Sequence, residues 1–345
     1  MSTFSFFKSI LPAALLLAGS TAARSWVQKS DIRGSQFLDT YSFYSGPDPT
    51  HGQVNFAQGP MLTWVDDDSR FNMKVDTHSS VKSGYRGSVR ISSNYRVGDG
   101  VIIANITHAP SGCSVWPAFW TLGEGLWPFG AEIDLLEWAN DAELDGGDNA
   151  ITLHTQPGCS FKEAGEQSGR LLSKNCDVFS TDNRGCSIRA TSPDGANGTA
   201  ARGFNANGGG IIAMERDFGD NGHGIRVWQW PRNNLSAIPD DVLAGNKTVN
   251  PSAWGTPTAS FPVNPLCGNL FNDHQIIFDI TLGGTWAAGA WGGTKCEDKF
   301  GSISNMIQNH GSAYDEAYWS VDSVKHFVSY KDLKNKDDGF FDDLF

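Results

Sequence analysis

Hydrophobic and polar residues alternate in short runs along much of the chain, with the two-residue period of a β-strand. Runs of this kind occupy residues 70–76, 87–93, 210–215, 224–230 and 318–328. Residues 101–106 and 275–282 are more continuously apolar, so we expect core strands there, the first of them buried on both faces. No stretch of residues 25–96 has a convincing helical period, the whole chain predicts almost no helix, and glycine-rich turns separate the runs. The pattern predicts an all-β fold, an antiparallel β-sandwich.

The densest apolar segment lies in the second quarter of the chain. Its parts, in order, are a strand candidate at 115–122, a loop at 123–130, an acidic strand at 132–137, a polar loop at 140–149 and a strand at 150–155. Pro117 lies in the first of these strands, and a proline there argues for an edge strand or a bulge. The polar loop suggests that the strands on either side of it are antiparallel neighbours, which places His154 near the acidic residues.

The acidic strand reads Glu132-Ile133-Asp134-Leu135-Leu136-Glu137. Strict alternation puts Glu132 and Asp134 on one face and Glu137 on the other. A β-bulge, one extra residue in this strand, would return Glu137 to the face of the other two acids. Carboxylates this close resist ionising together, so holding them on one face costs free energy unless they serve a function. Cleavage of a glycosidic bond is a function that needs two close carboxylates, one as nucleophile and one as proton donor.

The ends of the chain differ in composition from its centre. Residues 1–23 predict a secretory signal peptide, with Lys8, a short apolar core and a small-residue cleavage site. No later apolar run approaches the ~18 residues of a membrane-spanning helix. No linker or repeat divides residues 24–330, which we interpret as one domain, and the charged tail at 331–345 is expected to be poorly ordered.

Residues 158–210 are too long for an ordinary loop and predict excursions held by disulfides.

Export explains the cysteines, since disulfides persist in oxidising compartments. They are Cys113, Cys159, Cys176, Cys186, Cys267 and Cys296, for which many pairings are possible. No two have Cys-x-x-Cys spacing, which argues against a zinc site. Candidate glycosylation sequons occur at Asn105, Asn197, Asn234 and Asn246.

The formal net charge of −12 and the pI near 5.0 disfavour binding to nucleic acid or to an anionic membrane, which would need a basic patch. A neutral ligand is compatible with this charge. The 12 tryptophans offer flat rings that either fill a core or stack on the apolar faces of sugars. We expect a monomer without a cofactor or catalytic metal, and nothing in the sequence indicates a structural calcium ion.

Residues 116–138, WPAFWTLGEGLWPFGAEIDLLEW, followed by TLHT at 152–155, resemble the signature of glycoside hydrolase family 16. The similarity is strongest to the fungal secreted endo-β-1,3(4)-glucanases, or laminarinases. Further similar segments are GSVRI at 87–91, GGGIIAME at 208–215, AWGTPTASFP at 253–262, HQIIFDIT at 274–281 and YWSVDSVK at 318–325. The resemblance covers the mature chain up to about residue 330. Residues 282–286, LGGTW, and Arg216 depart from the usual pattern of the family.

The resemblance implies a concanavalin-like β-jelly roll, two curved antiparallel sheets with a concave substrate cleft. Glu132 matches the nucleophile, Glu137 the general acid/base and Asp134 the assisting carboxylate between them. The inserted residue before Glu137 is typical of the laminarinase branch. The resemblance implies that the substrate-binding residues are Trp120, Trp127, His154, Arg86 and Trp254. We expect five other tryptophans to lie in the core or at its rim, namely Trp116, Trp138, Trp228, Trp286 and Trp319.

The sequence thus predicts a secreted endo-β-1,3(4)-glucanase, extracellular or in the cell wall, that cleaves β-1,3 and mixed-linkage glucans with retention of configuration. One alternative is a cell-wall transglycosylase of the same family, which passes the glycosyl unit to a sugar instead of water. A second is a lectin-like protein that binds glucan without cutting it. The complete set Glu132, Asp134 and Glu137 argues against the lectin, because binding alone does not need these acids. The sequence does not separate the hydrolase from the transglycosylase.

Overall fold

The structure is a computed structural model that describes residues 25–140, 148–192, 197–219, 222–263 and 265–334. The predicted signal peptide, most of the polar loop at 140–149 and residues 335–345 lie outside the described residues. The first four residues of the predicted tail lie in a short helix, α8 (Tyr330–Lys334). Within the described ranges, no helix combines the length and apolar composition needed to cross a bilayer.

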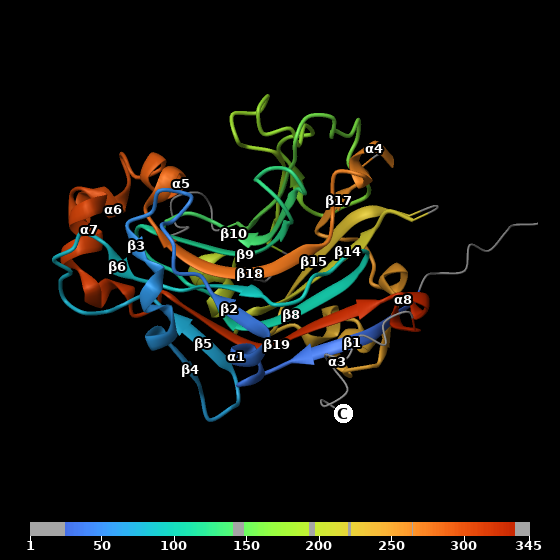
Figure 1. The fold of residues 1–345 in the computed structure, drawn as a ribbon, viewed down its shortest axis with the longest axis horizontal. Coiled ribbons are helices and arrows are strands. Elements are labelled where there is room, and N and C mark those ends of the chain that lie inside the picture. The colour runs from blue at the N-terminus through green and yellow to red at the C-terminus, as the bar shows by residue number, and fades with distance from the viewer. Residues whose placement is uncertain (1–24, 141–147, 193–196, 220–221, 264, 335–345) are drawn as a thin grey trace, which may run out of the picture.

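Two large antiparallel sheets stack face to face (Figure 1) and form the predicted jelly-roll sandwich. The eight-stranded sheet has the order β12 (Arg170–Leu171), β13 (Cys186–Arg189), β11 (Ala150–His154), β10 (Glu132–Glu137), β9 (Val115–Gly123), β18 (His274–Leu282), β7 (Arg90–Ser93) and β2 (Tyr41–Phe43). The nine-stranded sheet has the order β16 (Thr248–Val249), β1 (Trp26–Ile32), β19 (Tyr318–Val328), β8 (Gly100–His108), β14 (Gly210–Asp217), β15 (Gly224–Pro231) and β17 (Ala259–Phe261), and β5 (Phe71–Lys74) joins β19 to β4 (Thr63–Val65).

Short elements connect the sheets. A parallel pair joins β3 (Val54–Asn55) to β6 (Arg86–Gly87). The α-helices are α1 (Gln36–Thr40), α2 (Ala201–Ala206), α3 (Asp240–Leu243), α4 (Pro265–Gly268), α5 (Gly284–Gly289), α6 (Lys295–Phe300), α7 (Ile303–Asn309) and α8. The 3-10 turns are η1 (Phe56–Leu62), η3 (Leu235–Ala237), η4 (Pro251–Ala253) and η5 (Gly311–Tyr314). Figure 1 shows α5, α6 and α7 gathered at one end of the sandwich.

The main core lies between the sheets and follows the alternation in the sequence. In β8, Ile102 and Ala104 belong to this core, whereas Val101 and Ile103 pack in a second cluster on the opposite side of the nine-stranded sheet. β8 is therefore buried on both faces, as predicted. We call the second group the outer tryptophan cluster, because it contains Trp26, Trp228, Trp230 and Trp254. Trp138, Trp228 and Trp319 are buried, as expected for core residues.

The position of β9 corrects one expectation. Pro117 suggested an edge strand or a bulge. β9 lies in the middle of its sheet between β10 and β18, so the edge strand is wrong, whereas the β9–β10 pairing does contain a bulge, in β10. Pairing with β10 ends at Ala118, opposite Glu137, so Pro117 has no β10 residue across from it. A proline cannot donate a backbone hydrogen bond, and its position just beyond the pairing explains why β9 tolerates it.

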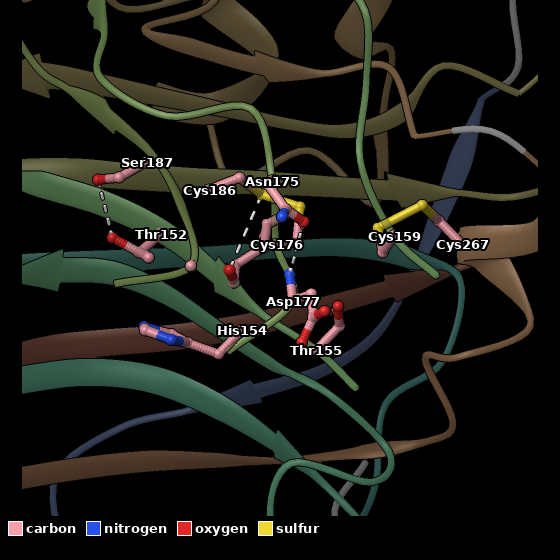
Figure 2. Close-up of a disulfide and its surroundings, with 12 residues drawn as sticks. Thr152, His154, Thr155, Cys159, Asn175, Cys176, Asp177, Cys186, Ser187 and Cys267 are labelled. Atoms are coloured by element: carbon pink, nitrogen blue, oxygen red, sulfur yellow. Dashed lines mark hydrogen bonds between the residues drawn. A yellow bond between two sulfur atoms is a disulfide. The ribbon is translucent and has the colours of Figure 1, made fainter. Parts of the chain in front are cut away.

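All six cysteines form disulfides, with the pairs Cys113–Cys296, Cys159–Cys267 and Cys176–Cys186. The last two hold the excursion between β11 and β13, as predicted for this part of the chain. Cys176 also donates its backbone N–H to the carbonyl of Cys159 at 3.0 Å, which ties the two bridges together. Figure 2 shows both bridges beside the end of β11.

Candidate active site

The catalytic strand candidate, β10, contains the predicted bulge. Asp134 pairs with Trp120 of β9 and Leu136 pairs with the next residue, Phe119, so Leu135 is the extra residue. Leu135 and Leu136 are both buried in the core. The next residue, Glu137, therefore returns to the face that already carries Glu132 and Asp134. One inserted leucine brings three carboxylates onto one face of one strand.

The side chain of Asn149 stabilises the backbone of this bulge. Its Oδ1 accepts a hydrogen bond from the Glu137 N–H at 2.8 Å, and its Nδ2 donates to the Leu135 carbonyl at 2.8 Å. A bulge interrupts the regular ladder and leaves backbone groups without strand partners. A single buried amide supplies one acceptor and one donor at this place. Asn149 is a site residue that the sequence analysis missed.

We call the side of the eight-stranded sheet that points away from the core the acid face. Cross-strand partners share a face, so the strand register defines its rows. One row contains Glu137, Ala118, Asp279 and Arg90 on β10, β9, β18 and β7. The adjacent rows pair Asp134 with Trp120 and with Thr152, and Glu132 with His154.

Indole groups donate to both glutamates. Trp127 Nε1 donates to Glu132 Oε2 at 2.9 Å, and Trp116 Nε1 donates to Glu137 Oε1 at 2.8 Å. Asp134 lies between them, 2% exposed, with its Oδ2 at 3.3 Å from His154 Nε2. Among the described residues, no lysine or arginine forms an ion pair with any of the three acids.

Burial raises the pKa of all three carboxyls. The pKa of Glu132 rises to about 8 through burial and the neighbouring charge of Asp134, although the Trp127 N–H and His154 lower it. The pKa of Asp134 rises to about 8 through burial and the charge of Asp279. Burial, with the charge of Asp134, raises the pKa of Glu137 well above its ordinary value. The site therefore holds protons near neutral pH, which a proton donor requires.

The loop between β9 and β10 presents an aromatic and apolar surface beside Glu132. Trp127 is 43% exposed even though its Nε1 is bound to the carboxylate. Leu126 and Phe129, in the same turn, are 83% and 50% exposed. Asn272 fixes the base of the loop through hydrogen bonds to the Glu124 backbone at 2.8 and 3.0 Å. Trp127 thus lies in the position that the sequence predicted, next to the nucleophile candidate.

His154 ends β11 directly opposite Glu132, as its place in the sequence predicted. Its ring lies 6.4 Å from that of Trp127. Figure 2 shows His154 projecting from β11, near the Thr152–Ser187 hydrogen bond and the Cys176–Cys186 bridge. The bridge follows from the register, because Cys186 pairs with Leu153, the residue before His154. The disulfide-bonded loop therefore begins at the site itself.

Two predicted binding residues lie elsewhere. Arg86 has no exposed surface, and its guanidinium donates to the backbone carbonyls of Asp76, His78 and Ile307 at 2.9, 2.7 and 2.6 Å. A fully enclosed cation with these partners cannot contact a sugar, so its role is structural. Trp254 is 5% exposed in the outer tryptophan cluster, on the sheet that does not carry the acids.

The arginine on the acid face is instead Arg90, four residues later. Its guanidinium lies 5.0 Å from the ring centres of both Tyr44 and Trp120, and its Nη1 is 4.0 Å from Asp279 Oδ2. Trp120 is on the acid face as predicted, but Arg90 covers it and leaves it 8% exposed. The alternation of residues 87–93 could have identified Arg90, since Ile91 beside it belongs to the core.

Glu132, Asp134 and His154 could also bind a cation, since each offers one ligand atom within 4.8 Å of the others. The raised pKa values of both acids weaken a metal site, which needs ionised carboxylates. Of the sequon residues, Asn197, Asn234 and Asn246 are exposed. Asn105 is half-buried within β8, and its Nδ2 donates to Asp322 at 3.1 Å, which argues against a glycan there. Glycosylation of the exposed three remains a prediction.

Comparison with known proteins gives a consistent result. Residues 41–327 match the family model described as the XgeA-like catalytic GH16 domain. The chain is 33% identical to an endo-1,3(4)-β-glucanase of Arthroderma benhamiae over 326 residues, 90% of this chain and 67% of the relative. The chain spans between 40% and 70% of the length of the first four curated relatives that it matches.

Two solved structures are similar over nearly their whole length. The GH16 laminarinase 16A of Phanerochaete chrysosporium, solved with β-glucans in its donor and acceptor sites, is 35% identical with a TM-score of 0.78, covering 88% of this chain and 99% of that one. An elongating GH family 16 β-1,3-glucosyltransferase is 30% identical with a TM-score of 0.75, covering 88% of this chain and 100% of that one.

Proposed function

Because the chain belongs to the XgeA-like catalytic domains of glycoside hydrolase family 16 and is therefore a glycosidase, we propose that it is an endo-1,3(4)-β-glucanase that retains anomeric configuration. The observation that carries this proposal is the bulge in β10. It places Glu132 and Glu137 on one face, with an indole donor on each and Asp134 between them. Retaining hydrolases need two carboxyls only ~5–5.5 Å apart, one ionised and one protonated.

We assign the roles by the positions that the two glutamates match in the family signature, because an indole N–H and His154 favour the charged form of both. Glu132 matches the nucleophile. Glu137, whose pKa burial raises well above its ordinary value, starts protonated and donates to the leaving oxygen. A bond forms between the Glu132 carboxylate and the anomeric carbon as the glycosidic bond breaks. Glu137 then takes a proton from water, which hydrolyses the glycosyl ester and frees Glu132.

Asp134 regulates the charge of its neighbours. It is almost fully buried and adds negative potential at both glutamates, so it disfavours the state in which all three acids are ionised. His154 Nε2 lies 3.3 Å from Asp134 Oδ2, and His154 favours the charged form of Glu132. This arrangement supports one ionised and one protonated glutamate in the same site.

The substrate is a neutral β-1,3 or mixed-linkage glucan. The exposed ring of Trp127 offers a flat surface for the C–H face of a glucosyl unit, and Leu126 and Phe129 extend that apolar surface. The net charge of −12 does not favour polyanionic polymers. The three disulfides are consistent with an extracellular protein, and we propose secretion as the route.

The product profile on laminarin, lichenan, cellulose and xylan tests the proposal, with an oligosaccharide acceptor present in one set of reactions. We expect short oligosaccharides from laminarin and lichenan, and an initial β-anomer by NMR. Products longer than the substrate would identify a transferase, as in the similar glucosyltransferase structure. An initial α-anomer would contradict retention, and binding without products would identify a lectin.

A further inference from the structure

Trp116 connects the acid/base candidate to a part of the fold outside the catalytic strand. It lies on β9 two residues before Ala118, so its side chain is on the acid face, and its Nε1–H reaches Glu137 Oε1 at 2.8 Å. The bond leaves Oε2 as the oxygen of Glu137 that can carry a proton to the substrate. The orientation of this one indole therefore decides which oxygen of the carboxyl is available.

The indole of Trp116 is held from two directions. Trp286 of α5 meets it edge to face, with ring centres 5.7 Å apart and planes at 83°. Gly284 supports the ring from another direction, because a Cβ on this glycine would lie 3.0 Å from the Trp116 ring. Gly284 also has a φ of +69°, which side-chain-bearing residues rarely adopt.

The segment that carries Gly284 and Trp286 is itself anchored next to the site. Gly283 donates its N–H to the Ser114 carbonyl at 2.8 Å, and Asn140 Nδ2 donates to the Ala287 carbonyl at 2.9 Å. Asn140 follows β10 by three residues, and its Oδ1 accepts from the Ser114 N–H at 3.0 Å. These bonds fix α5 relative to both β9 and the end of the catalytic strand. The segment is also the one whose sequence, LGGTW, departs from the usual family pattern.

We propose that Trp116 is a positioning residue for the acid/base carboxyl of Glu137, and that Trp286 keeps its indole in place. The inference rests on the proposed function, since it assigns a role to a neighbour of its proton donor. When Glu137 gives up its proton, the Nε1–H bond becomes charge-assisted and stronger, so Trp116 assists the departure of that proton. The bond also keeps Oε2 directed at the same place when Glu137 later takes a proton from water.

The test is Trp116→Phe, which removes the N–H and keeps an aromatic ring against Trp286. Loss of a hydrogen bond to a charged group predicts a fall in kcat/KM on laminarin of about 10- to 100-fold. A 2,4-dinitrophenyl laminarioside has a leaving group that needs no proton, so its rate of glycosylation should change less than about twofold. The basic limb of the pH profile should move to higher pH, because the variant loses a donor that favours ionised Glu137.

Matched variants separate positioning from folding. Trp138→Phe is the control, since Trp138 is buried beside Glu137 and its Nε1 has no hydrogen-bond partner in the described structure. It should change both substrates equally and leave the pH profile unmoved. Trp286→Ala should reproduce the selective loss on laminarin, and Trp286→Phe should restore most of it.

Two results would overturn the inference in distinguishable ways. Equal losses on laminarin and on the activated substrate in Trp116→Phe, with an unmoved basic limb, would show that Trp116 has only a structural role. A wild-type protein that cleaves no glucan would overturn the proposed function and this inference with it.

Discussion

Indole groups donate to carboxylates in two regions of this molecule, and the regions differ in what neutralises the acid. On the acid face, Trp116 donates to Glu137, which has no lysine or arginine ion-pair partner among the described residues. In the outer tryptophan cluster, Trp26 donates to Glu215 at 3.0 Å, and Arg226 Nε donates to the same carboxylate at 2.8 Å. Both regions thus contain a carboxylate that accepts a hydrogen bond from an indole, but of Glu137 and Glu215 only Glu215 is paired with an arginine within the described ranges.

The consequence is chemical. An arginine beside a buried carboxylate stabilises its negative charge, which lowers its pKa and keeps it ionised. Glu132, Asp134 and Glu137 have no such ion pair among the described residues, and burial raises the pKa of each of them. A tryptophan near an acid is therefore no sign of catalysis by itself. What distinguishes Glu137 from Glu215 is burial without an ion-pair partner among the described residues.

The largest expected effect comes from removing the charge at the acid face. Glu132→Gln keeps the shape and an acceptor for Trp127 but cannot attack the anomeric carbon. We expect kcat on laminarin to fall to below about one thousandth of the wild-type value, with glucan binding retained. Full residual activity would remove Glu132 as the nucleophile. Steady-state kinetics and isothermal titration with laminarihexaose make the measurement.

The same substitution in the outer tryptophan cluster should change stability and leave catalysis alone. Glu215→Gln removes the partner of Arg226 and leaves a largely buried cation unpaired, so we expect a loss of about 3 kcal/mol in the free energy of unfolding. Urea denaturation measures it, and kcat of the folded fraction should not change. Glu316→Gln is the control. Its side chain is 68% exposed and, among the described residues, forms an ion pair with His108 alone, so the loss should be less than about 0.5 kcal/mol. Loss of kcat in Glu215→Gln would break the comparison.

The smallest expected effect comes from removing an indole N–H donor, from Trp127 on the acid face or from Trp254 in the outer tryptophan cluster. Trp127→Phe removes the N–H that favours ionised Glu132, whose pKa is already raised to about 8. The nucleophile acts when ionised, so a higher pKa moves the acidic limb of kcat/KM to higher pH, and activity below that limb falls several-fold. Trp254→Phe, which loses the bond to Asp241, should leave the pH profile in place. An unmoved acidic limb in Trp127→Phe would separate Trp127 from the charge of Glu132.

Local patterns explain what the sequence could predict. Alternation gave the strands and the sandwich, and the extra Leu135 gave the bulge, because the side-chain period of a strand is read directly from neighbouring residues. His154 followed from the short connection between two strands. These features depend on residues that are close together in the chain.

The errors have a different physical origin. Alternation places Arg90 on the face opposite the core residue Ile91, but the register with β18 is needed to place it in the same row as Glu137. Trp254 follows η4 and packs against the other sheet, where its ring centre lies 5.1 and 5.8 Å from those of Trp228 and Trp230. The sequence does not show that Trp116 contacts Glu137, because the two residues become neighbours only through β9–β10 pairing. Each depends on contacts between distant segments.

The pairing of β1 with β19 has a consequence for how the chain is made. These strands come from opposite ends of the described residues, and β19 also pairs with β5 and β8. During synthesis, the nine-stranded sheet therefore cannot be completed until nearly all of the chain has emerged. The Cys113–Cys296 disulfide also forms late, because its cysteines are 183 residues apart, whereas Cys176 and Cys186 are separated by only 10. A nascent chain that stops before residue 318 exposes the edges of β1, β5 and β8 together, which invites association with other incomplete chains.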